Sequence, residues 1–157
     1  MKNSSSKYLM IGIIFLVLCG CHSAKSEYEK LVEFAEKYTS AWNSKQPEKI
    51  ASYYAEDGML TVNNGKPSVG RKQLAETAQY YMEAFPDMEL TMDSLTVEDR
   101  KYRYYWTFIG TNTGQGGTGN KVEFSGFEEW TMNDQGLVKK SIGTYDAEDY
   151  LKQLGGN

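Results

Sequence analysis

Three segments between residues 27 and 85 carry apolar positions at the spacing of amphipathic helices. Between Glu27 and Asn43 such positions recur every three or four residues, which predicts one long helix. Pro47 suits the start of a helix, so a short second helix is expected over residues 48–54. A third helix is expected over residues 71–85 and should end before Pro86. The apolar face of the first helix comprises Tyr28, Leu31, Val32, Ala35, Tyr38 and Trp42. The apolar face of the third helix comprises Leu74, Ala78, Tyr81 and Phe85.

Beyond Pro86 the apolar spacing changes from helical to alternating, which is typical of β-strands. The alternation slips by one position near Asp93 and Ser94, which predicts a β-bulge there. The faces of three further strands comprise Tyr102, Tyr104, Trp106 and Phe108; Val122, Phe124, Trp130 and Met132; and Val138, Ile142 and Thr144. With a short strand over residues 58–62 and a last helix over residues 147–154, this order predicts an α+β fold. Three N-terminal helices and a short C-terminal helix would pack against one side of a curved antiparallel sheet.

The N-terminus has the pattern of an export signal. Lys2 and Lys7 precede an apolar run over residues 8–20, shorter than the roughly 20 residues that a membrane-spanning helix needs. The run ends in Leu18-Cys19-Gly20-Cys21, which resembles the lipobox of bacterial lipoproteins, where cleavage precedes the second Cys and that Cys is acylated. The alternative is an ordinary secretory signal with incidental cysteines.

The lipobox interpretation divides the chain into three parts. Residues 1–20 are expected to be a lipoprotein signal peptide, residues 21–26 a polar tether, and residues 27–157 one folded domain. Cys21 would be the lipidated residue and would join the protein to membrane lipid. The expected location is the bacterial cell envelope, with the domain on the extracytoplasmic side of the membrane.

Scarce residues limit the chemistry of the main body. The single His is His22 and the two Cys are Cys19 and Cys21, so the main body has no residues for a His/Cys zinc site, a Ser-His-Asp triad or a disulfide. With Lys2 and Lys7 removed, 15 basic and 21 acidic residues remain, a net charge of −6. An acidic domain does not favour nucleic acid as a partner. We expect no metal and no cofactor.

A glycine-rich segment between two predicted strands superficially matches a nucleotide-binding motif. Residues 114–119 satisfy the G-x-G-x-x-G pattern, which in a dinucleotide site opens a helix whose N-terminus holds the pyrophosphate. Here the residues that follow, 121–124, continue as a strand. We therefore interpret the segment as a hairpin loop.

Several segments between Tyr28 and Gly155 carry a family resemblance. They are residues 84–87 (Ala-Phe-Pro-Asp), 106–114, 118–122, 126, 145–146 and 153–155. Together they resemble the SnoaL-like branch of the nuclear transport factor 2-like superfamily. The resemblance implies a cone-shaped α+β fold whose sheet and helices enclose a pocket, and a dimer is common for that fold. Relatives include polyketide ester cyclases, isomerases and dehydratases, and the fold alone does not choose among these activities.

The resemblance points to Asp146, because cyclase relatives use an aspartate of the last strand as a general base. Alternation also places Asp146 on the face of Val138, Ile142 and Thr144, where burial would raise the pKa of its carboxyl toward neutral pH. A competing interpretation, with slightly more support, is that Asp146 caps the helix that follows it. Many relatives have His after the Gly-Thr pair; Asn112 stands here and can donate a hydrogen bond to an oxyanion but cannot shuttle a proton.

Glu128 is the second candidate catalytic carboxyl. It shares strand parity with Phe124 and Trp130, so an unshifted strand turns its side chain inward. Two carboxyls in an apolar cone could then divide the acid and base roles between them. The alternative, which we favour at this point, is a bulge near Gly126 that turns Glu128 outward.

Aromatic residues are the candidates for the pocket lining. Such residues can bind a flat apolar ligand, and they also fill the core of any domain of this size. The candidates are Trp42, Tyr81, Phe85, Tyr104, Trp106, Phe124 and Trp130. The favoured hypothesis is a lipid-anchored envelope protein that binds a small apolar or amphipathic molecule. The alternative is an enzyme of cyclase or isomerase type in which Asp146 abstracts a proton next to a carbonyl, and either could be a homodimer.

Overall fold

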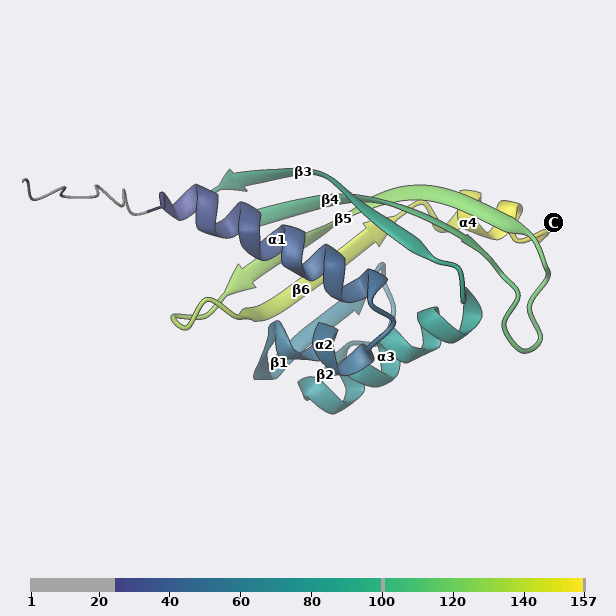
Figure 1. Cartoon of the computed structure of the whole chain (residues 1–157), viewed down its shortest axis with the longest axis horizontal. Helices are drawn as coiled ribbons and strands as arrows, with labels where there is room; N and C mark the ends of the chain where they lie inside the picture. Colours follow the sequence, from purple (N-terminus) through teal and green to yellow (C-terminus); the bar gives the residue numbers. More distant parts are fainter. Residues whose placement is uncertain (1–24, 100, 157) are drawn as a thin grey trace, which may run out of the picture.

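A computed structural model describes residues 25–99 and 101–156 of the chain (Figure 1). The predicted leader, the lipidation residue Cys21 and most of the tether lie outside the described residues. No helix within the described ranges is long and apolar enough to cross a membrane. The elements follow in the order α1 (Glu27–Asn43), α2 (Pro47–Ser52), β1 (Tyr54–Val62), β2 (Ser68–Val69), α3 (Gly70–Ala84), β3 (Glu89–Glu98), β4 (Lys101–Thr111), β5 (Lys121–Met132), β6 (Val138–Tyr145) and α4 (Ala147–Gln153).

The six strands form one sheet in the order β2-β1-β6-β5-β4-β3. β3 to β6 are neighbours in sequence and in space, and each pairs antiparallel with the next. β1 and β6 run parallel, which corrects the prediction of an antiparallel sheet throughout. The cause is the long connection between them: α3 and the four strands β2 to β5 intervene, so the chain does not return through a hairpin. The predicted α+β class, with helices against a curved sheet, is confirmed.

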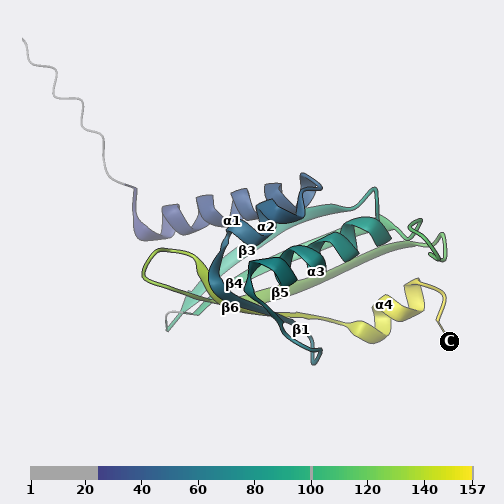
Figure 2. The same cartoon turned by 90° about the horizontal axis from the view of Figure 1, so that it is seen from below.

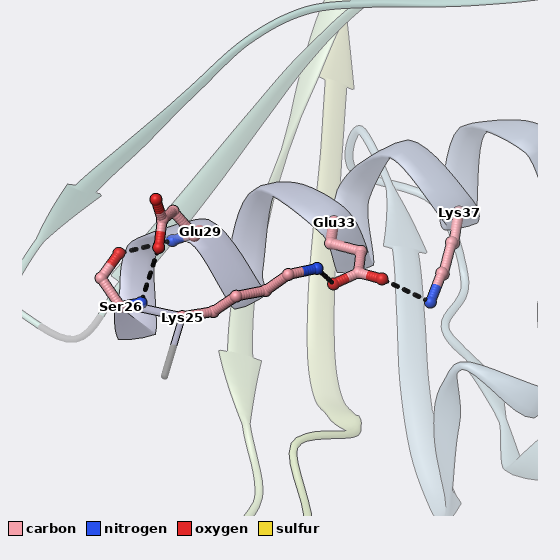
Figure 3. A network of polar contacts seen from close by, with 5 residues as sticks. All are labelled: Lys25, Ser26, Glu29, Glu33 and Lys37. Carbon is pink, nitrogen blue, oxygen red and sulfur yellow. Dashed lines mark hydrogen bonds and ion pairs between the residues drawn. The ribbon is translucent and has the colours of Figure 1, made fainter. Parts of the chain in front are cut away.

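The long first helix begins and ends where the periodicity places it. Ser26 is its N-cap: the Ser26 hydroxyl accepts from the Glu29 N–H at 3.1 Å, and the Glu29 carboxylate accepts from the Ser26 N–H at 2.7 Å. Figure 3 shows this reciprocal capping box beside a second contact set, in which Glu33 lies between Lys25 at 2.6 Å and Lys37 at 2.9 Å. The two ammonium groups lower the pKa of the Glu33 carboxyl to about 2. Lys25 and Ser26, the last two residues of the predicted tether, thus contact the first two turns of α1.

α1 and α3 pack on the same side of the sheet and close one core with it (Figure 2). α1 contributes Ala35, Tyr38 and Trp42 to this core, and α3 contributes Leu74 and Ala78. The sheet contributes alternating residues, as the period of two requires. The short helix α4 lies at the C-terminal end, beyond β6.

Register shifts in the sheet decide which side chains reach its inner face, and β1 shifts against β6 between Tyr54 and Met59 in addition to the shifts of β3 and β6. β3 shifts register between Met92 and Ser94, so the predicted bulge is confirmed. β6 shifts register as well: Thr131 pairs with Lys140 while Met132 pairs with Val138, which leaves Lys139 as an extra residue. This second bulge, which the sequence analysis did not predict, reverses the alternation of β6 after Val138.

Candidate functional site

A cavity opens between the helices and the inner face of the sheet. The centre of a water molecule can move through about 70 Å³ of it. Its lining comes from α1, α3, the residue before β3, and every strand except β2. The lining residues are Trp42, Leu60, Val62, Tyr81, Met88, Leu90, Trp106, Phe108, Phe124, Glu128, Gly143 and Tyr145. Apart from Glu128, the polar side-chain groups of these lining residues are tyrosine hydroxyls and indole N–H groups, and the rest of the surface is apolar.

Glu128 lies inside the domain because β5 pairs with β4 without a register shift. Trp106 pairs with Gly126 and Tyr104 with Glu128, so the alternation from Phe124 continues unbroken. The favoured interpretation, a bulge near Gly126 that turns Glu128 outward, is therefore wrong. The side chain is 7% exposed. A single-residue shift would have moved this carboxyl to the outer face of the sheet.

Four donors from four elements converge on the Glu128 carboxyl. Oε2 accepts from the Ser141 hydroxyl at 2.6 Å, the Trp130 Nε1 at 2.8 Å and the Tyr54 hydroxyl at 3.3 Å. The Tyr38 hydroxyl lies 3.2 Å from both carboxyl oxygens and 3.1 Å from the Tyr54 hydroxyl. These contacts satisfy a group whose burial would otherwise be costly.

Burial and hydrogen bonding act on the Glu128 carboxyl in opposite directions. Burial raises its pKa above the usual value for glutamate, and the four donors partly offset that rise because they stabilise the charged form. Burial together with the nearby Glu128 charge raises the pKa of Tyr38 and of Tyr54 well above that of a free phenol, so both remain protonated donors at neutral pH. Glu128 is thus the one group of the set that is a carboxyl able to give or accept a proton, while the two phenols stay protonated.

Two tryptophans of the cavity wall carry buried N–H groups with no hydrogen-bond partner. They are Nε1 of Trp42 and Nε1 of Trp106. The Trp42 N–H lies toward the Tyr38 hydroxyl and favours its ionised form slightly, yet it does not reach hydrogen-bond geometry. A buried donor without an acceptor costs free energy, so the Trp106 N–H is a place where a ligand acceptor would be stabilised.

Gly126 makes room for the Trp106 ring. A Cβ at position 126 would lie 2.7 and 2.8 Å from two ring carbons of Trp106 and 2.5 Å from the Thr144 carbonyl oxygen. Only a residue without a side chain lets the indole lie this close to β5. Trp106 then meets Phe124 edge-on, with ring centroids 5.8 Å apart.

The predicted lining residues divide into two groups. Trp42, Tyr81, Trp106 and Phe124 line the cavity, whereas Phe85, Tyr104 and Trp130 lie in the packed core outside it, contrary to expectation. Tyr104 stacks on Trp130 with centroids 4.9 Å apart, and Phe85 packs edge-on against Phe108 at 5.2 Å. Because the rings of Phe85, Tyr104 and Trp130 pack against other rings, they do not line the cavity.

Strand alternation also gave Phe108 as a possible lining residue, and it does line the cavity, whereas Leu60, Gly143 and Tyr145 were missed. Leu60 and Phe108 carry a signal in their strand alternation, which assigns them to the inner face. Gly143 and Tyr145 carry none, because the unpredicted bulge at Lys139 is what turns them inward.

Asp146 does not face the cavity. The same bulge turns Ile142 and Thr144 away from the inner face, so the expected inward face of β6 ends at Val138. Asp146 is exposed and is the N-cap of α4, where its carboxylate accepts from the N–H groups of Glu148 at 3.0 Å and Asp149 at 2.9 Å. The capping interpretation is confirmed, and the expectation of a desolvated base at this position is wrong.

Asn112 belongs to the loop between β4 and β5. Its side-chain amide donates to the Ala84 carbonyl at 3.2 Å, and its side-chain oxygen accepts from the Thr118 N–H at 2.8 Å. It fixes the hairpin loop to the end of α3 and is not among the cavity residues. The glycine-rich segment lies in this same loop, as predicted.

No group of three or more His, Cys, Asp or Glu side chains within the described ranges is arranged to hold a metal ion. The chemistry available in the cavity is therefore that of one buried carboxyl, phenol and indole donors, and aromatic surface. Such a set can bind a small molecule by its shape and polar groups, and Glu128 can give or accept a proton.

Comparisons with known proteins agree with this architecture. A solved structure of TsrD from Streptomyces laurentii superimposes with a TM-score of 0.72 at 19% identity, covering 85% of this chain and 100% of that one. A Catenulispora acidiphila protein with a ketosteroid isomerase-like fold, solved in complex with trimethylamine, gives 0.71 at 14% identity, covering 80% and 94%. A phenazine biosynthesis-related protein from Pseudomonas aeruginosa gives 0.63 at 17% identity, covering 83% and 92%. At these identities the likeness shows the fold.

The search of curated proteins found no match. The sequence profile of the SnoaL-like polyketide cyclase family matches residues 32–154. The chain belongs to this family.

Proposed function

We propose that this SnoaL-like protein is a lipid-anchored protein of the bacterial cell envelope whose domain binds a small, mostly apolar molecule. The observation that carries the binding part is the cavity itself: an apolar pocket with one buried carboxyl and the unpartnered indole N–H of Trp106. Ligand sites typically combine apolar walls with a few polar groups in this way. The trimethylamine complex of the Catenulispora acidiphila protein is a precedent for a small molecule bound by a relative of this fold.

The anchoring part rests on the sequence. Leu18-Cys19-Gly20-Cys21 after an apolar run is the pattern of a bacterial lipoprotein signal, and α1 begins six residues after Cys21. Acyl chains on Cys21 would hold an acidic domain that has no electrostatic attraction to an anionic membrane.

The anchor is tested with the full-length chain expressed in bacteria supplied with a labelled fatty acid. Label on the wild type, and its loss in Cys21→Ser, are expected. Cys19→Ser is the matched control and should keep the label. An unlabelled wild-type chain in the soluble fraction would overturn the anchor.

The binding function is tested by native mass spectrometry of the full chain extracted in mild detergent. Gly143→Val serves to fill the cavity, because a Cβ at position 143 meets its nearest neighbour, the Glu128 Cγ, only at 3.7 Å. A small molecule should accompany wild type and the control Asp146→Asn, and should be lost from Gly143→Val. The absence of a small molecule from every preparation would contradict the proposal.

A second candidate function is proton-transfer catalysis in the same cavity. Its specific support is the buried Glu128 carboxyl, whose pKa is raised toward the range of a useful acid or base. Incubating the recovered molecule with wild type and with Glu128→Gln distinguishes the two functions. A product formed by wild type alone supports catalysis, and an unchanged molecule in both supports binding.

A further inference from the structure

The cavity holds a buried acid without a basic partner. No Lys or Arg in residues 25–99 and 101–156 forms an ion pair with Glu128, and the groups that offset its raised pKa are neutral donors. Charged groups that are buried in proteins are usually paired with an opposite charge. A cation bound beside this carboxyl would stabilise its ionised form, which burial otherwise disfavours.

The walls around this carboxyl are aromatic and meet at steep angles. Trp106 and Phe124 are inclined at 80° to each other, and Trp42 and Tyr81 at 74°. Rings set nearly perpendicular surround a volume on several sides instead of forming one flat slot for a planar ligand. The negative faces of aromatic rings attract cations, most strongly where water is excluded.

We propose that the cavity binds a small alkylammonium ion, with the positive nitrogen held by the ionised Glu128 carboxylate and by the surrounding rings. The inference rests on the proposed binding function and names its ligand class. An uncharged hydrocarbon would fill the space between the aromatic walls but would leave the Glu128 carboxylate without a counter-charge. An organic anion would be repelled by Glu128, because like charges at short range in a low dielectric oppose each other.

The size of the cavity agrees with this class. Its 70 Å³ is room for a few water-sized groups, since a site needs roughly 10–15 Å³ of such volume to hold a single water. A volume of this size admits only a compact ligand, such as a small methylated ammonium ion, and excludes a polycyclic polyketide. A hydroxyl on the ligand, as in choline, can also accept from the unpartnered N–H of Trp106.

Isothermal titration calorimetry on the full chain in detergent compares choline with dimethylbutanol, its uncharged carbon isostere. We expect choline to bind wild type about tenfold more tightly than dimethylbutanol, or better, because only the charged probe gains the ring and carboxylate attraction. Glu128→Gln should remove most of this preference while leaving dimethylbutanol binding unchanged. Asp146→Asn, outside the cavity, should retain the preference.

Phe124→Leu gives an independent reading if Glu128→Gln does not fold. It replaces an aromatic wall with an aliphatic one, so choline binding should weaken several-fold and dimethylbutanol binding should not. Equal affinities of wild type for the two probes, or a preference that survives both substitutions, would overturn the alkylammonium inference. Binding of dimethylbutanol without choline would overturn it and leave the proposed function intact. Binding of neither probe, with no co-purified molecule, would overturn both.

Discussion

Replacing Gly126 by alanine adds one carbon at the tightest contact of the cavity wall. The new Cβ would lie 2.5 Å from the Thr144 carbonyl oxygen and 2.7 Å from the nearest ring carbon of Trp106. The carbonyl belongs to β6, whose Tyr145 pairs with Gly126 itself, so it cannot retreat without disturbing the β5–β6 ladder. The indole is enclosed by Phe124 and Tyr145. Neither neighbour can move freely.

The magnitude follows from the cost of overpacking. Extra methyl groups in a packed interior cost about 1–3 kcal/mol, and we expect the upper part of this range because one clash is with backbone. Gly143→Ala is the matched control on the adjacent strand. Its Cβ would have its nearest neighbours at 3.7 and 3.8 Å, which is ordinary contact. Its stability should stay near wild type or rise by about 0.4–1 kcal/mol, because the unfolded chain loses conformational freedom.

The assay is urea denaturation of the wild type and both variants, followed by circular dichroism, with the free energy of unfolding extrapolated to water. Gly126→Ala should lower the midpoint without changing the slope, and Gly143→Ala should leave it in place. The reasoning is refuted if Gly126→Ala is as stable as wild type, or if the two alanines destabilise the protein equally. Either result would mean that the Trp106 ring does not depend on the bare backbone at position 126.

Three further outcomes follow from the polar contacts. Asp146→Ala should lower the free energy of unfolding by about 1 kcal/mol, because two hydrogen bonds from backbone amides are lost. Asp146→Asn should lower it by only about a few tenths of a kcal/mol. Equal losses in denaturation experiments would argue against the capping role of Asp146. Because the pKa of the Glu128 carboxyl is raised in the folded state, the folded chain keeps that proton to a higher pH than the unfolded chain does. The contribution of Glu128 to the free energy of unfolding therefore falls as the pH rises from about 4.5 through the raised pKa. The slope is at most about 1.4 kcal/mol per pH unit. The difference between wild type and Glu128→Gln, measured by denaturation across that window, isolates this slope, and a pH-independent difference would contradict it. Ser26→Ala removes one half of the capping box of α1 and should lower the free energy of unfolding by about 1 kcal/mol, measured by the same method. Ser52→Ala, at the end of α2, is the control and should be nearly neutral. Equal losses in the two variants would contradict the role of Ser26 as a cap.

The sequence predicted most of the fold because helices and strands reflect local periodicity. α1 was predicted at both of its ends, and the bulge of β3 appeared as a slip in the alternation near Asp93. The inner faces of β4 and β5 followed from alternation alone, since their pairing has no shift. The positions of Trp106 and Phe124 in the cavity wall follow from the same rule.

What only the tertiary structure decided is the phase of β6 and the environment of Glu128. The extra residue at Lys139 is defined by the pairing of β6 with β5, and it exchanges Ile142 and Thr144 for Ser141, Gly143 and Tyr145 on the inner face. That exchange makes Asp146 a helix cap and provides Glu128 with a hydroxyl donor. A local pattern cannot encode this, because a strand's phase depends on its partner. Nor can it show that Tyr38, Tyr54 and Ser141, far apart in the chain, would converge on one carboxyl and make its burial tolerable.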